Sequence, residues 1–208
     1  MEIKVFSSNG ADTGKTVSLP SDIFGATPND HAIYLDVKQY LANQRQGNHK
    51  TKVKAEVNYS TRKLKKQKGT GGARAGSIKS GVFVGGGRIH GPQPRDYSFK
   101  LNKKLKRVAR VSALSYKAAA NKIIALESLS YDKPSTKSFV ELINNLKVAN
   151  ERVLLVTPDN NTNVYLSGRN LEKAQTLPVS ELNTYQILKA KTLVLVDGSI
   201  EAIKQSLN

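Results

Sequence analysis

A stretch near the N-terminus has the residue types of a phosphate-binding loop. Residues 10–16, GADTGKT, follow an alternating segment and end in Gly-Lys-Thr, and such loops hold phosphates with backbone N–H groups and a lysine. Three residues separate the two glycines, whereas that motif needs four. The residues that follow, VSLP, cannot begin the helix whose N-terminus would face the phosphate. We therefore expect a hairpin turn here.

Other candidates for catalysis or metal binding lack the required spacing. The glycine clusters at 69–72 and 85–87 miss the dinucleotide fingerprint, because Arg74 and His90 stand where its third glycine would be. The three histidines show no metal-ligand spacing, and the absence of cysteine excludes thiolate ligands and a cysteine nucleophile. No nucleophile–base pair or carboxylate cluster is visible, so we predict that the protein is not an enzyme and holds no cofactor or metal.

Lysine and arginine carry the strongest chemical signal in the sequence. The 208 residues include 33 Lys and Arg against 16 Asp and Glu, a formal net charge of +17. The surplus lies between Lys38 and Arg110, where twenty basic residues accompany only two acids, Glu56 and Asp96. Basic side chains neutralise phosphates, and the interleaved glycines allow backbone N–H groups to approach them. The block therefore predicts nucleic-acid binding, and its few aromatic residues favour recognition of folded RNA through shape and backbone.

The same block lacks the apolar residues that a folded core needs. Nine of the fifteen glycines fall between Gly69 and Gly91, and apolar residues are scattered from Gln46 to Lys100. Such a segment cannot offset its ordering entropy by burying apolar surface. We therefore predict that residues 47–100 form an extended glycine-rich basic loop that becomes ordered on a polyanion. Residues 1–46 and 101–208 together form one globular domain that carries the loop.

Periodic patterns predict the elements of that globular domain. Strand patterns occupy residues 2–6, 16–19, 123–127, 152–157, 176–179 and 192–196. Helical patterns occupy residues 101–119, 135–147, 161–169, 181–189 and 199–207. A further helix has Thr27 as its N-cap and Pro28 at its first position, and ends before Gly47. The alternation predicts an α/β fold, a three-layer-like body with a mostly parallel sheet flanked by helices, plus the long basic extended loop.

Two of these helices have a predicted core side. In the helix after Thr27 the apolar stripe consists of Ile33, Val37, Tyr40 and Leu41. In the helix 101–119 the core side consists of Leu101, Leu105, Val108, Ser112, Tyr116 and Ala119. The opposite side of the helix 101–119 is cationic and carries Lys103, Lys106, Arg107, Arg110 and Lys117.

No segment has the features of membrane insertion or export. The longest apolar runs, such as residues 153–156, are far shorter than the roughly 20 residues that a membrane-spanning helix needs. The N-terminal residues MEIKVFSSNG lack a basic region followed by an apolar one. We expect a soluble, intracellular protein with no membrane partner.

Residues 64–77, LKKQKGTGGARAGS, resemble the signature of the universal large-subunit ribosomal protein four family in its bacterial form. The resemblance continues through residues 85–98, 101–104 and 182–185 and covers essentially the whole chain. It implies an α/β body on the outer side of the large subunit, a long loop that threads ribosomal RNA to the peptide exit tunnel, and a role in early subunit assembly. The implied location is the cytoplasmic ribosome. The implied partners are large-subunit ribosomal RNA, neighbouring large-subunit proteins including the second protein of the tunnel constriction, and the nascent peptide in passing.

The resemblance also implies which residues form the tip of the loop. The tip lies around residues 67–74, with residues 88–90 on the returning stretch. Its residues are Gln67, Lys68, Gly69, Thr70, Gly71, Gly72, Arg74, Arg88, Ile89 and His90. Gly72 stands where many bacterial relatives have arginine, and Lys65 replaces a common tryptophan, so the tip is less bulky at these positions.

Distributed phosphate contacts are the expected mode of binding. We predict that ribosomal RNA is held by Lys50, Lys52, Arg62, Lys63, Lys65, Lys66, Lys68, Arg74, Lys79, Arg88, Arg95, Lys103, Lys104, Lys106, Arg107 and Arg110. Two other interpretations stay open. An architectural DNA- or RNA-binding protein outside the ribosome would bind duplex DNA as tightly as ribosomal RNA. A Rossmann-like RNA-modifying enzyme with a basic arm would need a cofactor loop after a strand, and none is visible.

Overall fold

The computed structural model describes residues 1–207, which divide into two compact units. The first unit, called the body, comprises Met1–Leu41 and the chain from Lys100 onward. The second unit, called the basic segment, comprises Ala42–Phe99. Between residues 44 and 99 the structure describes no helix and no strand, apart from one isolated bridge between Lys63 and Ser77.

The body is built on a six-stranded sheet whose strands follow the order β2-β1-β3-β6-β4-β5. The strands are β1 (Glu2–Phe6), β2 (Asp12–Ser18), β3 (Ile123–Leu126), β4 (Val153–Thr157), β5 (Ala174–Pro178) and β6 (Thr192–Val196). Only the β1–β2 pair is antiparallel, and the four other pairs are parallel. This sheet confirms the α/β fold with a mostly parallel sheet.

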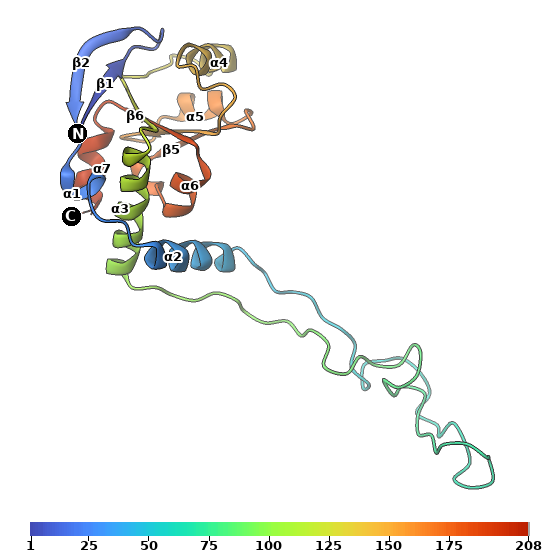
Figure 1. Cartoon of the computed structure of the whole chain (residues 1–208). Coiled ribbons are helices and arrows are strands. Elements are labelled where there is room, and N and C mark those ends of the chain that lie inside the picture. The colour runs from blue at the N-terminus through green and yellow to red at the C-terminus, as the bar shows by residue number, and fades with distance from the viewer. Residues whose placement is uncertain (208) are drawn as a thin grey trace. The chain divides into compact units, whose positions relative to one another are not determined.

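Helices cover both faces of the sheet (Figure 1). The helices are α1 (Ser21–Phe24), α2 (Asp30–Asn43), α3 (Lys103–Ala119), α4 (Thr136–Asn145), α5 (Thr162–Gly168), α6 (Thr184–Lys189) and α7 (Ser199–Leu207), with a 3₁₀ turn at Val179–Glu181. One buried cluster joins the sheet to α1, α3, α6 and α7, and a second joins it to α4 and α5. The helices and the sheet therefore form three layers.

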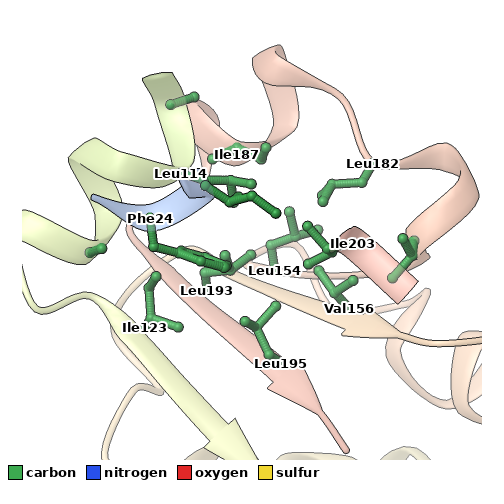
Figure 2. Packing of buried hydrophobic residues seen from close by; sticks show 14 of the residues in the cluster. Phe24, Leu114, Ile123, Leu154, Val156, Leu182, Ile187, Leu193, Leu195 and Ile203 are labelled. Carbon is green, nitrogen blue, oxygen red and sulfur yellow. The ribbon is translucent and has the colours of Figure 1, made fainter. Parts of the chain in front are cut away.

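The central strands supply residues to both clusters in turn. In β6, Leu193 and Leu195 belong to the first cluster, whereas Val194 and Val196 belong to the second. Strand β4 alternates in the same way, and its Leu154 lies in the first cluster beside Leu193 (Figure 2). Successive side chains of a strand point to opposite faces, so a strand covered on both sides must be apolar throughout. This burial explains the continuous apolar runs in the sequence.

A hairpin is present as expected, but its turn lies at residues 7–11, earlier than the predicted residues 10–16. The turn is closed by hydrogen bonds from Ser7 N to Ala11 O (2.9 Å) and from Gly10 N to Ser7 O (2.9 Å). The chain then continues into β2, which pairs antiparallel with β1. The strand predicted at residues 16–19 therefore begins earlier, at Asp12.

The prediction for the start of α2 was wrong. Asn29, and not Thr27, caps the helix, because its Oδ1 accepts a hydrogen bond from Ala32 N (3.0 Å). Pro28 consequently lies before the helix, which runs from Asp30 to Asn43. The apolar stripe was also partly wrong. Leu41 is 44% exposed, whereas Ala32 and Gln39 are buried.

The predicted core side of α3 was also only partly right, since Ser112 is buried and Leu101 and Leu105 are half-buried. Val108 and Tyr116 are 45% and 42% exposed, and Ala119 is also exposed. The buried residues of α3 are Ala109, Ser112, Ala113, Leu114, Ser115 and Ala118. Small side chains permit close approach of α1, and Ser115 Oγ donates a hydrogen bond to Ile23 O of α1 (3.0 Å). The second half of α3 is therefore buried through alanine and serine, which a hydropathy pattern scores weakly.

Among residues 1–207, no helix combines the length and the apolar character that crossing a membrane requires.

Candidate nucleic-acid interface

The basic segment runs out and back as two stretches that pair with each other (Figure 1). Backbone N–H groups and carbonyls join the stretches at four levels: Arg95 to Gly47 (3.3 Å), Thr51 to Pro92 (3.1 Å), Arg88 to Lys52 (2.9 Å) and Leu64 to Gly76 (2.9 Å). The bridge between Lys63 and Ser77 lies next to the last pair. Residues 65–75 therefore form the turn that joins the two stretches.

An aromatic side chain packs with two arginines where the stretches begin and end. The guanidinium carbon Cζ of Arg45 lies 3.7 Å from the centre of the Tyr97 ring, and that of Arg95 lies 4.4 Å from it. A hydrogen bond with Arg95, followed by the positive charges of Arg95 and Arg45, lowers the pKa of Tyr97. Cation–π contacts of this kind let arginines pack together without carboxylate partners.

Glycines serve two different purposes along the basic segment. A Cβ at Gly47 or Gly87 would lie 2.1 Å from Arg95 O or 2.4 Å from Lys54 N, so these glycines allow the two stretches to pack closely. In the turn, a Cβ at Gly69 or Gly71 would meet no atom of residues 1–207 within 4 Å. Gly69 and Gly71 are therefore open to contact with a ligand.

The cations of the basic segment are nearly all on its surface. Its thirteen Lys and Arg are exposed except for the half-buried Lys79: Arg45, Lys50, Lys52, Lys54, Arg62, Lys63, Lys65, Lys66, Lys68, Arg74, Lys79, Arg88 and Arg95. Arg45 and Lys54 share this exposure although sequence reasoning did not name them as binding residues. Both lie inside the same basic block of the sequence, and that position could have identified them as binding residues.

The two carboxylates of the basic segment already have local partners. Glu56 accepts from Lys50 Nζ (2.5 Å) and Val53 N (3.2 Å), and Asp96 accepts from Ser98 N (2.8 Å) and Ser98 Oγ (2.7 Å). The hydrogen bond from Lys50 lowers the pKa of Glu56, and the backbone hydrogen bond from Ser98 lowers the pKa of Asp96. Lys50 is thus partly neutralised, whereas the other exposed cations of the segment face solvent without a carboxylate among the described ion pairs.

The predicted tip residues divide between the turn and the returning stretch. Residues 67–72 and Arg74 are exposed in the turn, where the Lys63 ammonium group hydrogen-bonds to Gln67 Oε1. Residues 88–90 are also exposed but lie on the returning stretch, since Arg88 pairs with Lys52. His90 adopts a left-handed backbone conformation with φ of 53°.

The first half of α3 presents a second group of cations. Lys103, Lys104 and Arg107 are exposed, whereas Lys106 and Arg110 are half-buried. Desolvation lowers the pKa of Arg110, partly opposed by the charge of Asp36, and its buried Nε has no hydrogen-bond partner among the described residues. Arg110 is therefore less accessible to a phosphate than its three exposed neighbours. Lys117 is engaged elsewhere, because its Nζ donates to Ala190 O (2.6 Å).

The side chains that could bind a metal ion are dispersed among residues 1–207. In the described part of the chain, no three His, Cys, Asp or Glu side chains gather closely enough to hold a metal ion. Of the three histidines, His49 packs near Tyr97, with Nε2 3.4 Å from its hydroxyl oxygen.

Comparison with known proteins gives a single consistent result. Residues 17–206 match the model of the ribosomal protein L4/L1 family. The chain is 58% identical over 206 residues to the large ribosomal subunit protein uL4 of Parabacteroides distasonis, an alignment that covers 99% of each chain. It is 57% identical to the uL4 of Phocaeicola vulgatus over the full length of both chains. It is 54% identical to the uL4 of Porphyromonas gingivalis, over 99% of this chain and 98% of that protein.

Proposed function

Because the chain belongs to the ribosomal protein L4/L1 family, we propose that it binds ribosomal RNA as a structural component of the large ribosomal subunit, in the cytoplasm. Its partners are large-subunit ribosomal RNA and neighbouring proteins of the same subunit, and it acts early in subunit assembly. It performs no catalysis and needs no cofactor.

The surplus of exposed cations on the basic segment carries this proposal. Thirteen Lys and Arg accompany two acids, and both acids hold partners within the segment. Each phosphate that a lysine or arginine neutralises releases counterions, so RNA affinity falls steeply with salt concentration. Because many contacts share the binding, the loss of a single lysine has a small effect.

The turn of the basic segment is the part that lines the peptide exit tunnel. Residues 67–74 lie in the turn that follows the Leu64–Gly76 pair, and residues 88–90 lie further back on the returning stretch, where Arg88 pairs with Lys52. The open glycines Gly69 and Gly71 support this assignment, because a residue without a side chain lets an RNA backbone come close. The tip meets the second protein of the tunnel constriction and the nascent peptide.

The cations of α3 attach the body to the RNA surface. Lys103, Lys104 and Arg107 are exposed on its first half. Long basic side chains on a helix reach phosphates without fitting a particular base sequence, so these contacts position the protein and do not read sequence.

Sedimentation through a sucrose gradient tests the proposal. A lysate is run at moderate and at high salt, and each fraction is probed for this chain. Co-migration with the large subunit that survives the high-salt wash is expected, because a segment embedded in folded RNA is not removed by screening alone.

A matched pair of variants sharpens the test. Replacing Lys65, Lys66, Lys68 and Arg74 by glutamine removes cations from the turn, and replacing Lys133, Lys137, Lys147 and Lys204 by glutamine removes as many from the body. Only the first variant should lose salt-resistant co-migration. Release of the unmodified protein at high salt, with equal binding to duplex DNA and ribosomal RNA, would instead support an architectural nucleic-acid protein outside the ribosome.

A further inference from the structure

Four parallel strands of the body each follow a basic residue. Lys122 precedes β3, Arg152 precedes β4, Lys173 precedes β5 and Lys191 precedes β6. Parallel strands begin at the same edge of a sheet, so the four residues form a row in the order Lys122, Lys191, Arg152, Lys173. Backbone hydrogen bonds fix this row, since Lys191 N donates to Arg152 O (2.7 Å) and Val153 N donates to Lys173 O (2.8 Å).

One carboxylate neutralises half of the row. Glu151 Oε1 lies 2.7 Å from Lys191 Nζ and 3.6 Å from Lys122 Nζ. Its Oε2 also accepts a hydrogen bond from Thr192 Oγ1 (2.7 Å). Arg152 and Lys173, at the other half, form no ion pair with any of the residues 1–207. The positive charge of this half is therefore available to a ligand.

These two free cations line a pocket, called the amino-edge pocket, of about 230 Å³. Lys189 of α6 lines the pocket as a third cation, and Glu172 is the one carboxylate among its lining residues. Gln186 of α6 also lines it, and the buried Gln186 Oε1 accepts no hydrogen bond from the described part of the chain. A buried acceptor without a donor is costly, so a rotation of the Gln186 side chain that brings Oε1 to a donor on a ligand in the pocket would gain affinity.

We infer that the amino-edge pocket is an RNA-binding site of the body, in which Arg152, Lys173 and Lys189 hold a backbone phosphate and Gln186 accepts a hydrogen bond from the same nucleotide. An RNA strand offers both features at close range, because each phosphate is linked to a ribose whose 2′-hydroxyl is a donor. Arginine favours phosphate by offering two parallel N–H donors. The inference rests on the proposed function in one respect, the choice of RNA as the polyanion that occupies the pocket.

Lysine acetylation of the full chain, read by mass spectrometry, tests the inference site by site. The probe is a ten-nucleotide oligouridylate, and the comparison ligand is polyglutamate of the same total charge. Protection of Lys173 and Lys189 by the oligouridylate is expected, with Lys137 and Lys204 acetylated as fast as in the free protein. The last two lysines are exposed in the body and do not line the pocket.

The same spectra separate the two proposals. Protection of Lys65, Lys66 and Lys68 without protection of Lys173 and Lys189 would overturn the amino-edge site and leave the proposed function standing. No protection at any lysine would overturn both. Equal protection of Lys173 and Lys189 by polyglutamate would overturn the assignment to RNA and point to an acidic protein segment.

Two variants test the roles of Arg152 and Gln186, whose side chains are not acetylated. Arg152→Gln should raise the oligouridylate concentration that half-protects Lys189 by about tenfold, because one charge-assisted contact is lost. Gln186→Leu keeps all three cations and should produce a smaller rise. The matched control, Arg169→Gln, removes an exposed arginine that does not line the pocket and should leave Lys189 protection unchanged. An unchanged value for both pocket variants, with circular dichroism of a folded protein, contradicts the site.

Discussion

Arg45 and Tyr97 stack at the start and end of the basic segment, with the guanidinium carbon of Arg45 3.7 Å from the centre of the Tyr97 ring. The contact joins the outgoing stretch to the returning one through a cation and an aromatic face. Asp96 beside it is occupied by Ser98. The segment therefore holds its two ends together without using a carboxylate that would reduce its positive charge.

Gly47 should be essential to this arrangement. It has φ of 66°, and a Cβ there would lie 2.1 Å from Arg95 O and 2.9 Å from a ring carbon of Tyr97. We predict that Gly47→Ala separates the two stretches and weakens the hydrogen bond that Arg95 N donates to Gly47 O. Amide hydrogen exchange of Arg95 should become several-fold faster, as expected when a local opening costs less free energy.

Gly69→Ala is the matched control for that experiment. Gly69 also has a positive φ, 79°, but a Cβ there would meet no described atom within 4 Å. Both substitutions place alanine in a left-handed conformation, and only Gly47→Ala adds a collision. Equal acceleration of Arg95 exchange in the two variants would show that backbone strain alone, and not the collision, opens the segment.

Removing the turn should leave the body folded. Leu64 N donates to Gly76 O at 2.9 Å, so the two stretches are close enough there to be rejoined by an Asn-Gly turn in place of residues 65–75. The deletion removes Lys65, Lys66, Lys68 and Arg74, and the slope of log affinity for ribosomal RNA against log salt should shrink by about 3. Thermal unfolding of the deletion protein should match that of the intact chain. An unfolded product would show that the turn supports the core.

Hydropathy predicted the sheet well because the central strands are buried on both faces. The run VLLV of β4 sends Leu154 to one cluster and Leu155 to the other, so no polar residue occurs in the strand before Thr157. The face of α3 could not be predicted in that way. Ala113 and Ser115 pack against neighbouring helices through small side chains. The hydropathy pattern assigned the larger Val108 and Tyr116 to the core side, although both are exposed.

The basic segment was visible in the sequence because its cations are concentrated in one continuous stretch of the chain. The amino-edge pocket was not, because Arg152, Lys173 and Lys189 are separated in sequence and lie in a part of the chain whose charges nearly balance. Only the parallel register of β4 with β5 brings the first two together. Composition reports clusters that are local in sequence, whereas strand register creates clusters that are local in space.

The N-cap of α2 provides a direct comparison of sequence and structure. We predict that Asn29→Ala lowers the free energy of unfolding by about 1 kcal/mol, because Ala32 N loses Asn29 Oδ1 as its hydrogen-bond acceptor. Thr27→Ala should have a much smaller effect, since Thr27 lies outside the helix. Urea unfolding of both variants measures the difference. A larger loss of unfolding free energy for Thr27→Ala would show that Thr27 is the N-cap, as predicted from the sequence.

Glu151 should make stability depend on pH in acid. Its hydrogen bond with Lys191, followed by that with Thr192, lowers its pKa from 4.5 to about 2. A carboxyl group with a lowered pKa in the folded state stabilises the fold above its unfolded pKa, and that contribution is lost as the pH falls from 4.5 towards 2. The free energy of unfolding should therefore decline across this window.

Substitution of Glu151 tests the assignment of that acid-dependent decline. Glu151→Gln should remove part of the decline, because glutamine does not titrate and no longer forms ion pairs with Lys191 and Lys122. Glu172→Gln serves as the control, since Glu172 is exposed and forms no ion pair in the described part of the chain. Urea titrations at several pH values measure both variants, and an identical pH profile for Glu151→Gln and the unmodified protein would refute the assignment.

Gly168 at the end of α5 should tolerate no side chain, because a Cβ there would collide with its neighbours. A Cβ there would lie 2.9 Å from Thr176 Oγ1 of β5 and 3.0 Å from Phe139 Cζ of α4, in the cluster on the second face of the sheet. We predict that Gly168→Ala lowers the free energy of unfolding by about 1–3 kcal/mol through overpacking. Shortening the neighbour should relieve the collision, so Gly168→Ala combined with Phe139→Leu should lose less than the sum of the two single losses. Gly76→Ala, where a Cβ meets no described atom within 4 Å, controls for the substitution itself. If the two losses of unfolding free energy are strictly additive in urea unfolding, the collision at Gly168 is not with Phe139 but with Thr176.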